Sequence, residues 1–185
     1  MKIAFRVLFC LLAFTSHIAL AQTRFPISQA LDTWITNAEK DVVSAADAMP
    51  EDKYSCAPTA GQFAGVRTFG QQVKHLAANN YRMAARILDQ IPTPDQEFET
   101  GPETIQSKEQ ILGYVKGSFT ALHQAVAATT ADNALTPVMP TRVGTAKQNT
   151  RVEFAVDAVA HSYDHYGQMV EYLRMNGIVP PSSRK

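Results

Sequence analysis

Apolar residues recur at helical spacing in four segments of the chain, and proline, glycine and acidic residues interrupt the pattern between them. The four segments cover residues 28–49, 66–90, 107–126 and 150–175, and each carries an apolar stripe along one side. The sequence shows no repeats, no internal domain boundary and no convincing strands. Four such helices in a chain of 185 residues predict an all-α fold, a four-helix bundle with long connecting loops.

The stripes also predict which side chains form the core. On the first three segments these are Leu31, Trp34, Ile35, Ala38, Val42, Ala45 and Met49; Phe69, Val73, Leu76, Asn80, Met83, Ile87 and Leu88; and Ile111, Leu112, Val115, Phe119, Leu122 and Val126. On the fourth segment the predicted core stripe is Val152, Val156, Val159, Tyr163, Tyr166, Val170 and Leu173. A second, more polar stripe beside it consists of Phe154, Ala158, His161, His165, Gln168 and Tyr172.

Local signals mark the ends of the helices. Ser107, followed three residues later by Gln110, forms a capping box, and Asn176-Gly177 is a helix stop signal. Gly113 and Gly117 in the third segment are expected to allow close packing. The connections contain proline and glycine, and the middle one is acidic and expected at the surface; they cover residues 51–65, 95–103 and 130–149.

The first 21 residues have the pattern of a secretory signal peptide. Lys2 and Arg6 precede an apolar run from Val7 to Phe14, and Ala19-Leu20-Ala21 is a small-x-small cleavage site. A membrane anchor is the alternative, but the run is shorter than the roughly 18 residues that span a bilayer. We therefore expect cleavage after Ala21, a mature domain of residues 22–185 with no membrane partner, and a periplasmic or secreted location.

Charge and cysteine content narrow the picture further. Without the predicted signal peptide the chain has 15 basic and 17 acidic side chains, a balance that gives no indication of a nucleic-acid partner. Cys56 is then the one remaining cysteine, which excludes an internal disulfide. Cys56 is interpreted as a small apolar side chain, with a reactive thiol as the alternative.

Three histidines are the candidate functional residues. His161 and His165 are four residues apart, so a helix places them on one face. His75 flanks the apolar stripe of the second helix in an equivalent way. If the two helices are neighbours, three imidazoles meet; such a set suits zinc, nickel, iron or copper and leaves one coordination position open. On the residues alone, histidines that merely fill polar niches beside the core are an equal alternative.

Several familiar metal and haem motifs are absent from the sequence. A metalloprotease would need a glutamate after the first histidine, where Ser162 stands. The sequence has no Glu-x-x-His motif for a di-iron bundle and no Cys-x-x-Cys-His for covalent haem. His123 belongs to no motif and is interpreted as an ordinary residue at the edge of its helix.

Two stretches carry a family resemblance. Residues 67–76, Arg-Thr-Phe-Gly-Gln-Gln-Val-Lys-His-Leu, resemble the second-helix signature of the DinB-like superfamily of four-helix-bundle metalloproteins. Residues 161–168, His-Ser-Tyr-Asp-His-Tyr-Gly-Gln, together with 172–181, resemble its fourth-helix signature. The resemblance covers essentially the whole predicted mature chain. It implies that His75, His161 and His165 bind a divalent transition metal, commonly zinc or nickel, with water in the open position.

The resemblance also implies a class of activity. Characterised relatives include bacillithiol transferases and mycothiol-dependent maleylpyruvate isomerase, which are thiol-dependent enzymes. The implied function is a metal-dependent transferase or hydrolase that activates a thiol or water for a small-molecule substrate. A non-catalytic metal- or ligand-binding bundle is the alternative. A third alternative is a metal-free bundle that acts through its surface; relatives often pair, so a homodimer is also considered.

Three further residues are candidates for assisting the metal. Asp157 lies one turn before His161 and Asp164 directly precedes His165, so each is a candidate for orienting an imidazole or accepting a proton. Gln168 lies about a turn beyond His165 and is a candidate for facing the open coordination position. The alternative is an exposed helix surface for the two aspartates and a packing role for Gln168. No convincing catalytic base is identified in the sequence.

Overall fold

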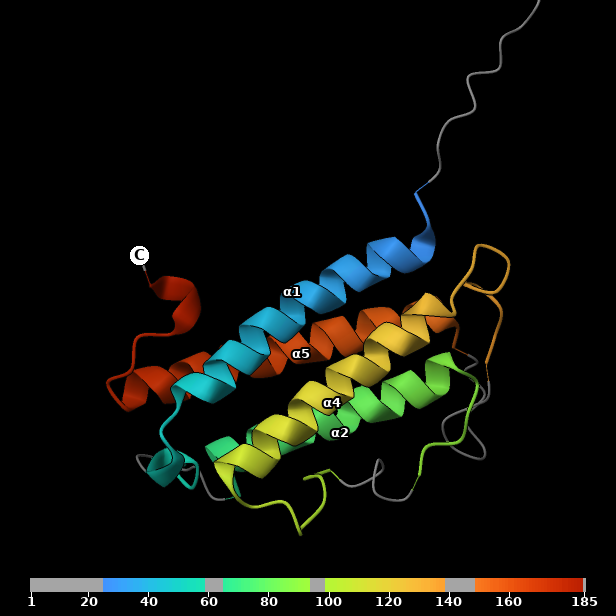
Figure 1. Cartoon of the computed structure of the whole chain (residues 1–185). Coiled ribbons are helices and arrows are strands. Elements are labelled where there is room, and N and C mark those ends of the chain that lie inside the picture. The colour runs from blue at the N-terminus through green and yellow to red at the C-terminus, as the bar shows by residue number, and fades with distance from the viewer. Residues whose placement is uncertain (1–24, 59–64, 94–98, 139–148, 185) are drawn as a thin grey trace, which may run out of the picture.

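The computed structural model describes residues 25–58, 65–93, 99–138 and 149–184, which form four long helices and two short 3-10 helices (Figure 1). These are α1 (Ile27–Ala48), η1 (Glu51–Lys53), α2 (Phe69–Ile87), α4 (Lys108–Ala127), α5 (Arg151–Met175) and η2 (Pro181–Ser183). The prediction of an all-α bundle is confirmed. None of the described helices is both long and apolar enough to span a bilayer. The predicted signal peptide lies outside the described residues.

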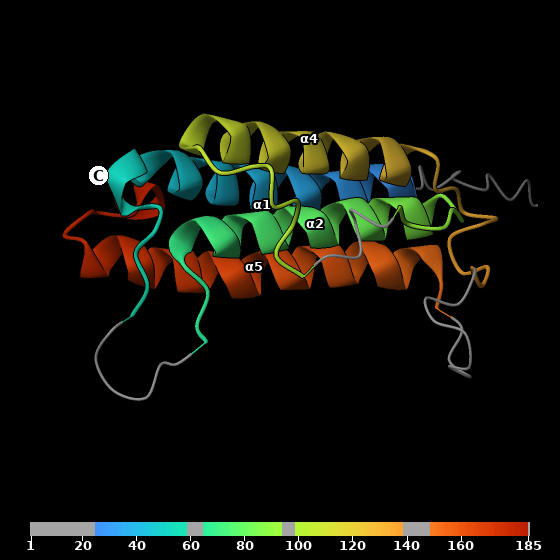
Figure 2. The same ribbon diagram turned by 90° about the horizontal axis from the view of Figure 1, so that it is seen from below.

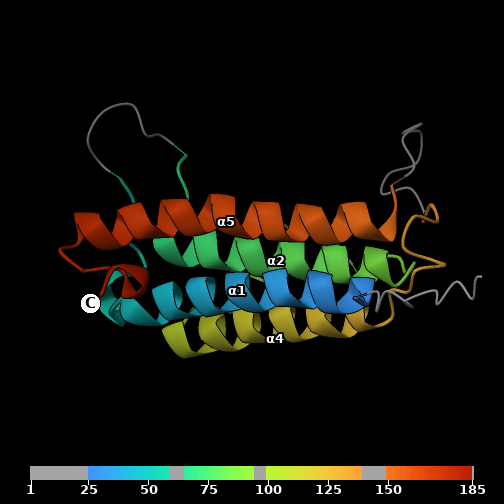
Figure 3. The same cartoon turned by 90° about the horizontal axis from the view of Figure 1, so that it is seen from above.

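The helices are arranged so that α1 and α2, although consecutive, do not form one of the main contacts. α2 packs against α4 and α5, and α1 packs against the same two helices. Figures 2 and 3 show that α2 and α4 run in one direction and that α1 and α5 run in the other. The connection between the parallel helices α2 and α4 must therefore return along the bundle, and part of it lies against α2. There Lys74 Nζ donates hydrogen bonds to the carbonyls of Pro102 and Ile105, at 3.1 and 3.0 Å.

Capping residues set the helix boundaries. Thr68, Ser107 and Thr150 each form a capping box at the start of α2, α4 and α5, which confirms the one predicted at Ser107. The predicted second helix, 66–90, is too long at both ends, because Thr68 caps the first turn and Asp89 adopts a φ of 59° beyond the last. At the end of α5, Gly177 has a φ of 73°, and the stop predicted there is confirmed.

The core confirms most of the predicted stripes on the first three helices but not the one on α5. Trp34 is 59% exposed, so its assignment to the core is wrong. On α5, Val156 is 55% exposed and Tyr163 and Tyr166 are half-buried. The residues that α5 buries are Phe154, Ala155, Ala158, Ser162, His165, Met169, Tyr172 and Leu173. The stripe that contains the histidines therefore belongs to the core face.

The two glycines of α4 differ from each other. A Cβ added at Gly117 would collide with the hydroxyl of Tyr81, so Gly117 does allow a close approach, although by a side chain. Gly113 is exposed, and a Cβ added there would meet nothing within 4 Å, so the close packing expected at that position is wrong.

Candidate metal centre

Three histidines from α2 and α5 meet between these two helices. His75 Nε2 lies 3.2 Å from His161 Nε2, and His161 Nε2 lies 3.0 Å from His165 Nε2. One ring nitrogen from each of the three lies within 4.8 Å of the others. His165 is buried, and the other two rings are half-buried. The three rings meet because α2 and α5 are neighbours. From the sequence, this meeting was expected only if the two helices lie side by side.

The spacing of the ring nitrogens fits a metal ion. Nitrogens that bind a tetrahedral zinc at about 2.0–2.1 Å lie roughly 3.3 Å from one another. The two distances between Nε2 atoms, 3.2 and 3.0 Å, are close to this value. Lone pairs of neutral imidazoles at this separation repel one another unless a proton or a cation lies between them. The donor set is therefore suited to a divalent ion with one coordination position left open.

Two of the rings have hydrogen-bond partners on the far side. His75 Nδ1 donates to the backbone carbonyl of Glu99, in the connection that returns along α2. His165 Nδ1 lies 2.5 Å from the side-chain amide of Gln72, which is buried. The Glu99 carbonyl accepts the Nδ1 proton of His75 and so selects the tautomer that leaves Nε2 of that ring free for a metal. Gln72 places its amide nitrogen, a donor, toward His165, and this contact favours a lone pair on Nδ1 of that ring. His161 Nδ1 is buried and has no hydrogen-bond partner among the described residues.

The three residues predicted to assist the metal lie at different places relative to the rings. Gln168 accepts a hydrogen bond from the Gln72 amide at 2.6 Å and donates to Asp164 at 3.2 Å. Gln168 and Asp164 thus extend from Gln72 to the surface as a short chain of hydrogen bonds, and both are exposed. Asp157 is exposed as well. Sequence reasoning missed the contact of Gln72, although its position three residues before His75 places it on the same face.

The surroundings keep all three imidazoles neutral. The pKa of His161 is lowered to about 3, mainly by burial. The nearby His165 and His75 and the guanidinium groups of Arg82 and Arg67 lower it further. Burial and the proximity of His75 lower the pKa of His165 to about 4. Burial also lowers the pKa of His75. At neutral pH the rings therefore keep the lone pairs that metal binding requires.

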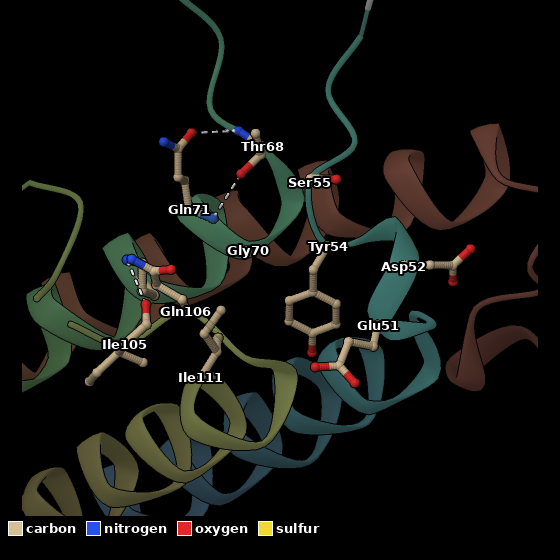
Figure 4. Close-up of a pocket in the computed structure, with 11 residues that line it drawn as sticks. Glu51, Asp52, Tyr54, Ser55, Thr68, Gly70, Gln71, Ile105, Gln106 and Ile111 are labelled. Atoms are coloured by element: carbon tan, nitrogen blue, oxygen red, sulfur yellow. Dashed lines mark hydrogen bonds between the residues drawn. The ribbon is translucent and has the colours of Figure 1, made fainter. Parts of the chain in front are cut away.

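A hollow of about 310 Å³ lies between η1, the start of α2 and the residues before α4 (Figure 4). Its lining includes Tyr54 and Ile111, which also limit the space at Gly70, since a Cβ there would lie 3.2 Å from the Tyr54 ring. None of the three histidines lines it. Within the described ranges, the three histidines are the one group of three or more His, Cys, Asp or Glu placed to hold a metal.

The two remaining candidates from the sequence have structural partners. His123 links α4 to α1, because Nδ1 lies 2.5 Å from a carboxylate oxygen of Asp32 and Nε2 lies 3.1 Å from one of Glu39. Cys56 is half-buried, and its sulfur accepts a hydrogen bond from Asn176 at 3.4 Å. Neither residue is part of the histidine cluster.

Comparison with known proteins gives a family match and a structural match. A family model described as the DinB superfamily matches residues 35–169, a range that includes all three histidines. No curated protein matches the sequence significantly. Among solved structures, a crystal structure of a DinB-like protein from Bacillus cereus ATCC 10987 superposes with a TM-score of 0.67 and 17% identity. The match covers 84% of this chain and 96% of that one, which shows a shared fold.

Proposed function

Because the chain belongs to the DinB superfamily, we propose that it binds a divalent transition metal through His75, His161 and His165, with zinc or nickel as the first candidates. The observation that carries this proposal is the meeting of three ring nitrogens within 4.8 Å of one another, with two of the Nε2 pairs at 3.2 and 3.0 Å, close to the spacing around a tetrahedral ion. Three protein ligands leave one position for an exchangeable group, as in catalytic rather than structural sites.

Hydrogen-bond partners of the imidazoles decide which ring nitrogen is free for a metal. The Glu99 carbonyl holds the proton of His75 on Nδ1, so that Nε2 of this ring points inward as a lone pair. The Gln72 amide would do the same for His165 after it turns over to present its oxygen to Nδ1. A divalent ion, when bound, supplies a Lewis acid that lowers the pKa of a water or thiol ligand. The proposed activity is that of a metal-dependent transferase or hydrolase acting on a small molecule through an activated thiol or water.

One observation favours a second candidate, a metal- or ligand-binding bundle without turnover. Among the described residues, the hydrogen-bond partners of the three imidazoles are a backbone carbonyl, a side-chain amide and one another. The nearby carboxylates, Asp157 and Asp164, are exposed. A general base within reach of the open position is therefore not supplied by these contacts, and general acid–base catalysis requires one.

Export from the cytoplasm is part of the proposal. It is supported by the basic start, apolar run and small-x-small site of the first 21 residues. Expression of the full chain in a bacterium, followed by N-terminal sequencing of the periplasmic fraction, tests it. A mature protein that begins at Gln22 supports export, and an uncleaved cytoplasmic protein contradicts it.

The metal is tested by elemental mass spectrometry on protein purified without a histidine tag. We expect about one equivalent of a transition metal in the wild type and at least a tenfold lower occupancy in His161→Ala and His165→Ala. His123→Ala is the matched control, because it removes a histidine outside the cluster. Occupancy that survives in the two cluster variants, or no metal after incubation with zinc and nickel, would refute the assignment.

Activity separates the two candidates once metal is found. The metal-loaded protein and its His75→Ala variant are assayed for transfer of small thiols and for ester hydrolysis. Turnover that depends on His75 supports the enzyme. A metal-loaded protein that exchanges a ligand without turnover supports the binding bundle.

A further inference from the structure

Two arginines lie near the three histidines, one just before α2 and one on α2. Arg67, just before α2, places Nη2 2.9 Å from a carboxylate oxygen of Glu99, the residue whose carbonyl accepts from His75. Arg82 lies seven residues beyond His75 and donates to the side chain of Asn79, one turn beyond His75. Long side chains on a helix point back toward its N-terminus, so Arg82 extends toward His75.

Four buried polar atoms around this cluster have no hydrogen-bond partner in the described part of the chain. They are Nε of Arg67, Nε of Arg82, Nδ2 of Asn79 and Nδ1 of His161. The arginine and asparagine atoms are N–H donors, and His161 becomes one at Nδ1 when its Nε2 carries the lone pair. Buried donors are normally satisfied by protein, water or a ligand, so a group of unpaired donors in one place is suited to an acceptor-rich ligand.

The charges around the cluster also favour an anionic ligand. The guanidinium groups of Arg67 and Arg82 lie close enough to His75 and His161 for their positive charge to act on both rings. The carboxylate of Glu99, which pairs with Arg67, is 78% exposed. Three neutral imidazoles leave the full charge of a divalent ion in place. The site as a whole is therefore electropositive and suited to an anion.

We propose that this site takes a small molecule bearing a carboxylate or phosphate, an oxyanion held between Arg67 and Arg82 beside the three histidines. A guanidinium binds either group with two parallel N–H donors, and the unpaired Nε atoms supply one donor of each pair. The inference rests on the proposed function, because the oxyanion would lie beside the histidines that would hold the metal. It narrows the proposed substrate to anionic small molecules.

The test is calorimetric titration of the protein with succinate and, separately, with inorganic phosphate, in metal-free and zinc-loaded forms. We expect Arg67→Gln and Arg82→Gln each to weaken binding about ten- to a hundredfold, as expected on losing hydrogen bonds to a charged group. Arg67→Lys and Arg82→Lys keep the charge but lose the two-donor geometry, so intermediate losses are expected. The two titrants distinguish a carboxylate site from a phosphate site.

Two further variants sharpen the result. Arg174→Gln is the matched control, because Arg174 is an exposed arginine of α5 paired with Glu171 at 2.6 Å, and its loss is expected to leave binding unchanged. Glu99→Gln removes the competing carboxylate from Arg67 but keeps the backbone carbonyl at His75, so it is expected to strengthen anion binding.

Metal content measured on each variant keeps the two proposals apart. If zinc binds and the anion affinity falls in the two arginine variants but not in Arg174→Gln, both proposals stand. If zinc binds but neither probe binds, or binding does not depend on these arginines, the oxyanion inference is overturned and the metal function stands. If no metal binds but arginine-dependent anion binding persists, the metal function fails and the anion site stands. If neither binds, both fail.

Discussion

Replacement of Gln72 by leucine is expected to weaken metal binding without removing a ligand. Gln72 is 2% exposed, and its amide nitrogen position lies 2.5 Å from His165 Nδ1 and 2.6 Å from Gln168 Oε1. Leucine has a similar size but cannot form hydrogen bonds. The Gln72→Leu variant therefore leaves the buried outer nitrogen of His165 without a partner.

The direction of this effect follows from the tautomer. A metal on Nε2 leaves the proton of His165 on Nδ1, which must then donate to the Gln72 amide oxygen. The amide turns over to present that oxygen, and Gln168 must turn as well to donate to it. The bond given up, from Gln168 to Asp164, is between exposed residues, where water replaces it at little cost.

The magnitude is that of an outer partner of a metal-bound histidine. Loss of such a partner costs about 10- to 100-fold in metal affinity, which corresponds to about 1.4–2.7 kcal/mol. The cost of leaving a buried donor unpaired, about 1–3 kcal/mol, gives the same range. Gln72→Glu is expected to hold metal at least as well as the wild type, because its carboxylate accepts the Nδ1 proton.

Zinc affinity is measured by competition with a chromophoric chelator. Gln124→Leu, which makes the same replacement at an exposed position of α4, is the control, and thermal unfolding without metal checks that each variant is folded. A folded Gln72→Leu variant that binds zinc as tightly as the wild type would refute the role of Gln72.

Two predictions concern the scaffold. Gly113→Ala is expected to raise the free energy of unfolding by up to about 1 kcal/mol, because the site is open, whereas Gly117→Ala is expected to lower it by collision with a tyrosine hydroxyl; equal shifts in urea unfolding would contradict this. Burial lowers the pKa of His123, but the hydrogen bonds and charges of Asp32 and Glu39 outweigh it, and the pKa is raised above 6.5. The charged ring therefore stabilises the fold fully below about pH 6.5 and less as the pH rises through the raised pKa, so His123→Gln is expected to cost about 1 kcal/mol at pH 5.5 and much less at pH 9; a cost that does not change with pH would rule this out.

The helices themselves were predictable from periodicity and caps, but the buried face of α5 was not. Periodicity counts apolar side chains, and four valines and two tyrosines outweighed the alanines and the serine. The buried face is instead set by the neighbours, since α5 packs against both α1 and α2. Small residues such as Ala155, Ala158 and Ser162 occupy that face and let the helices approach closely. A pattern that weighs hydrophobicity alone undercounts them.

The three histidines of the candidate site were predictable from the sequence, but the groups that contact their outer nitrogens were not. His161 and His165 share a face through their spacing alone, but the meeting with His75 depends on α2 lying next to α5, and chain order does not state this. Gln72 carries a weak signal, three residues before His75 on the same face. The carbonyl of Glu99 carries none, because every residue has a carbonyl and its position depends on the path of the connection.

The arrangement of the helices explains why that connection reaches the site. α2 and α4 are parallel neighbours, so the chain between them must travel back along the bundle before α4 begins. On the way it lies against α2, where Lys74 binds the carbonyls of Pro102 and Ile105 and His75 binds that of Glu99. An antiparallel pair would need only a short turn at the bundle end and would leave His75 without this partner. The described part of this connection thus lies against the histidine cluster, and it also places the Glu99 carboxylate on Arg67.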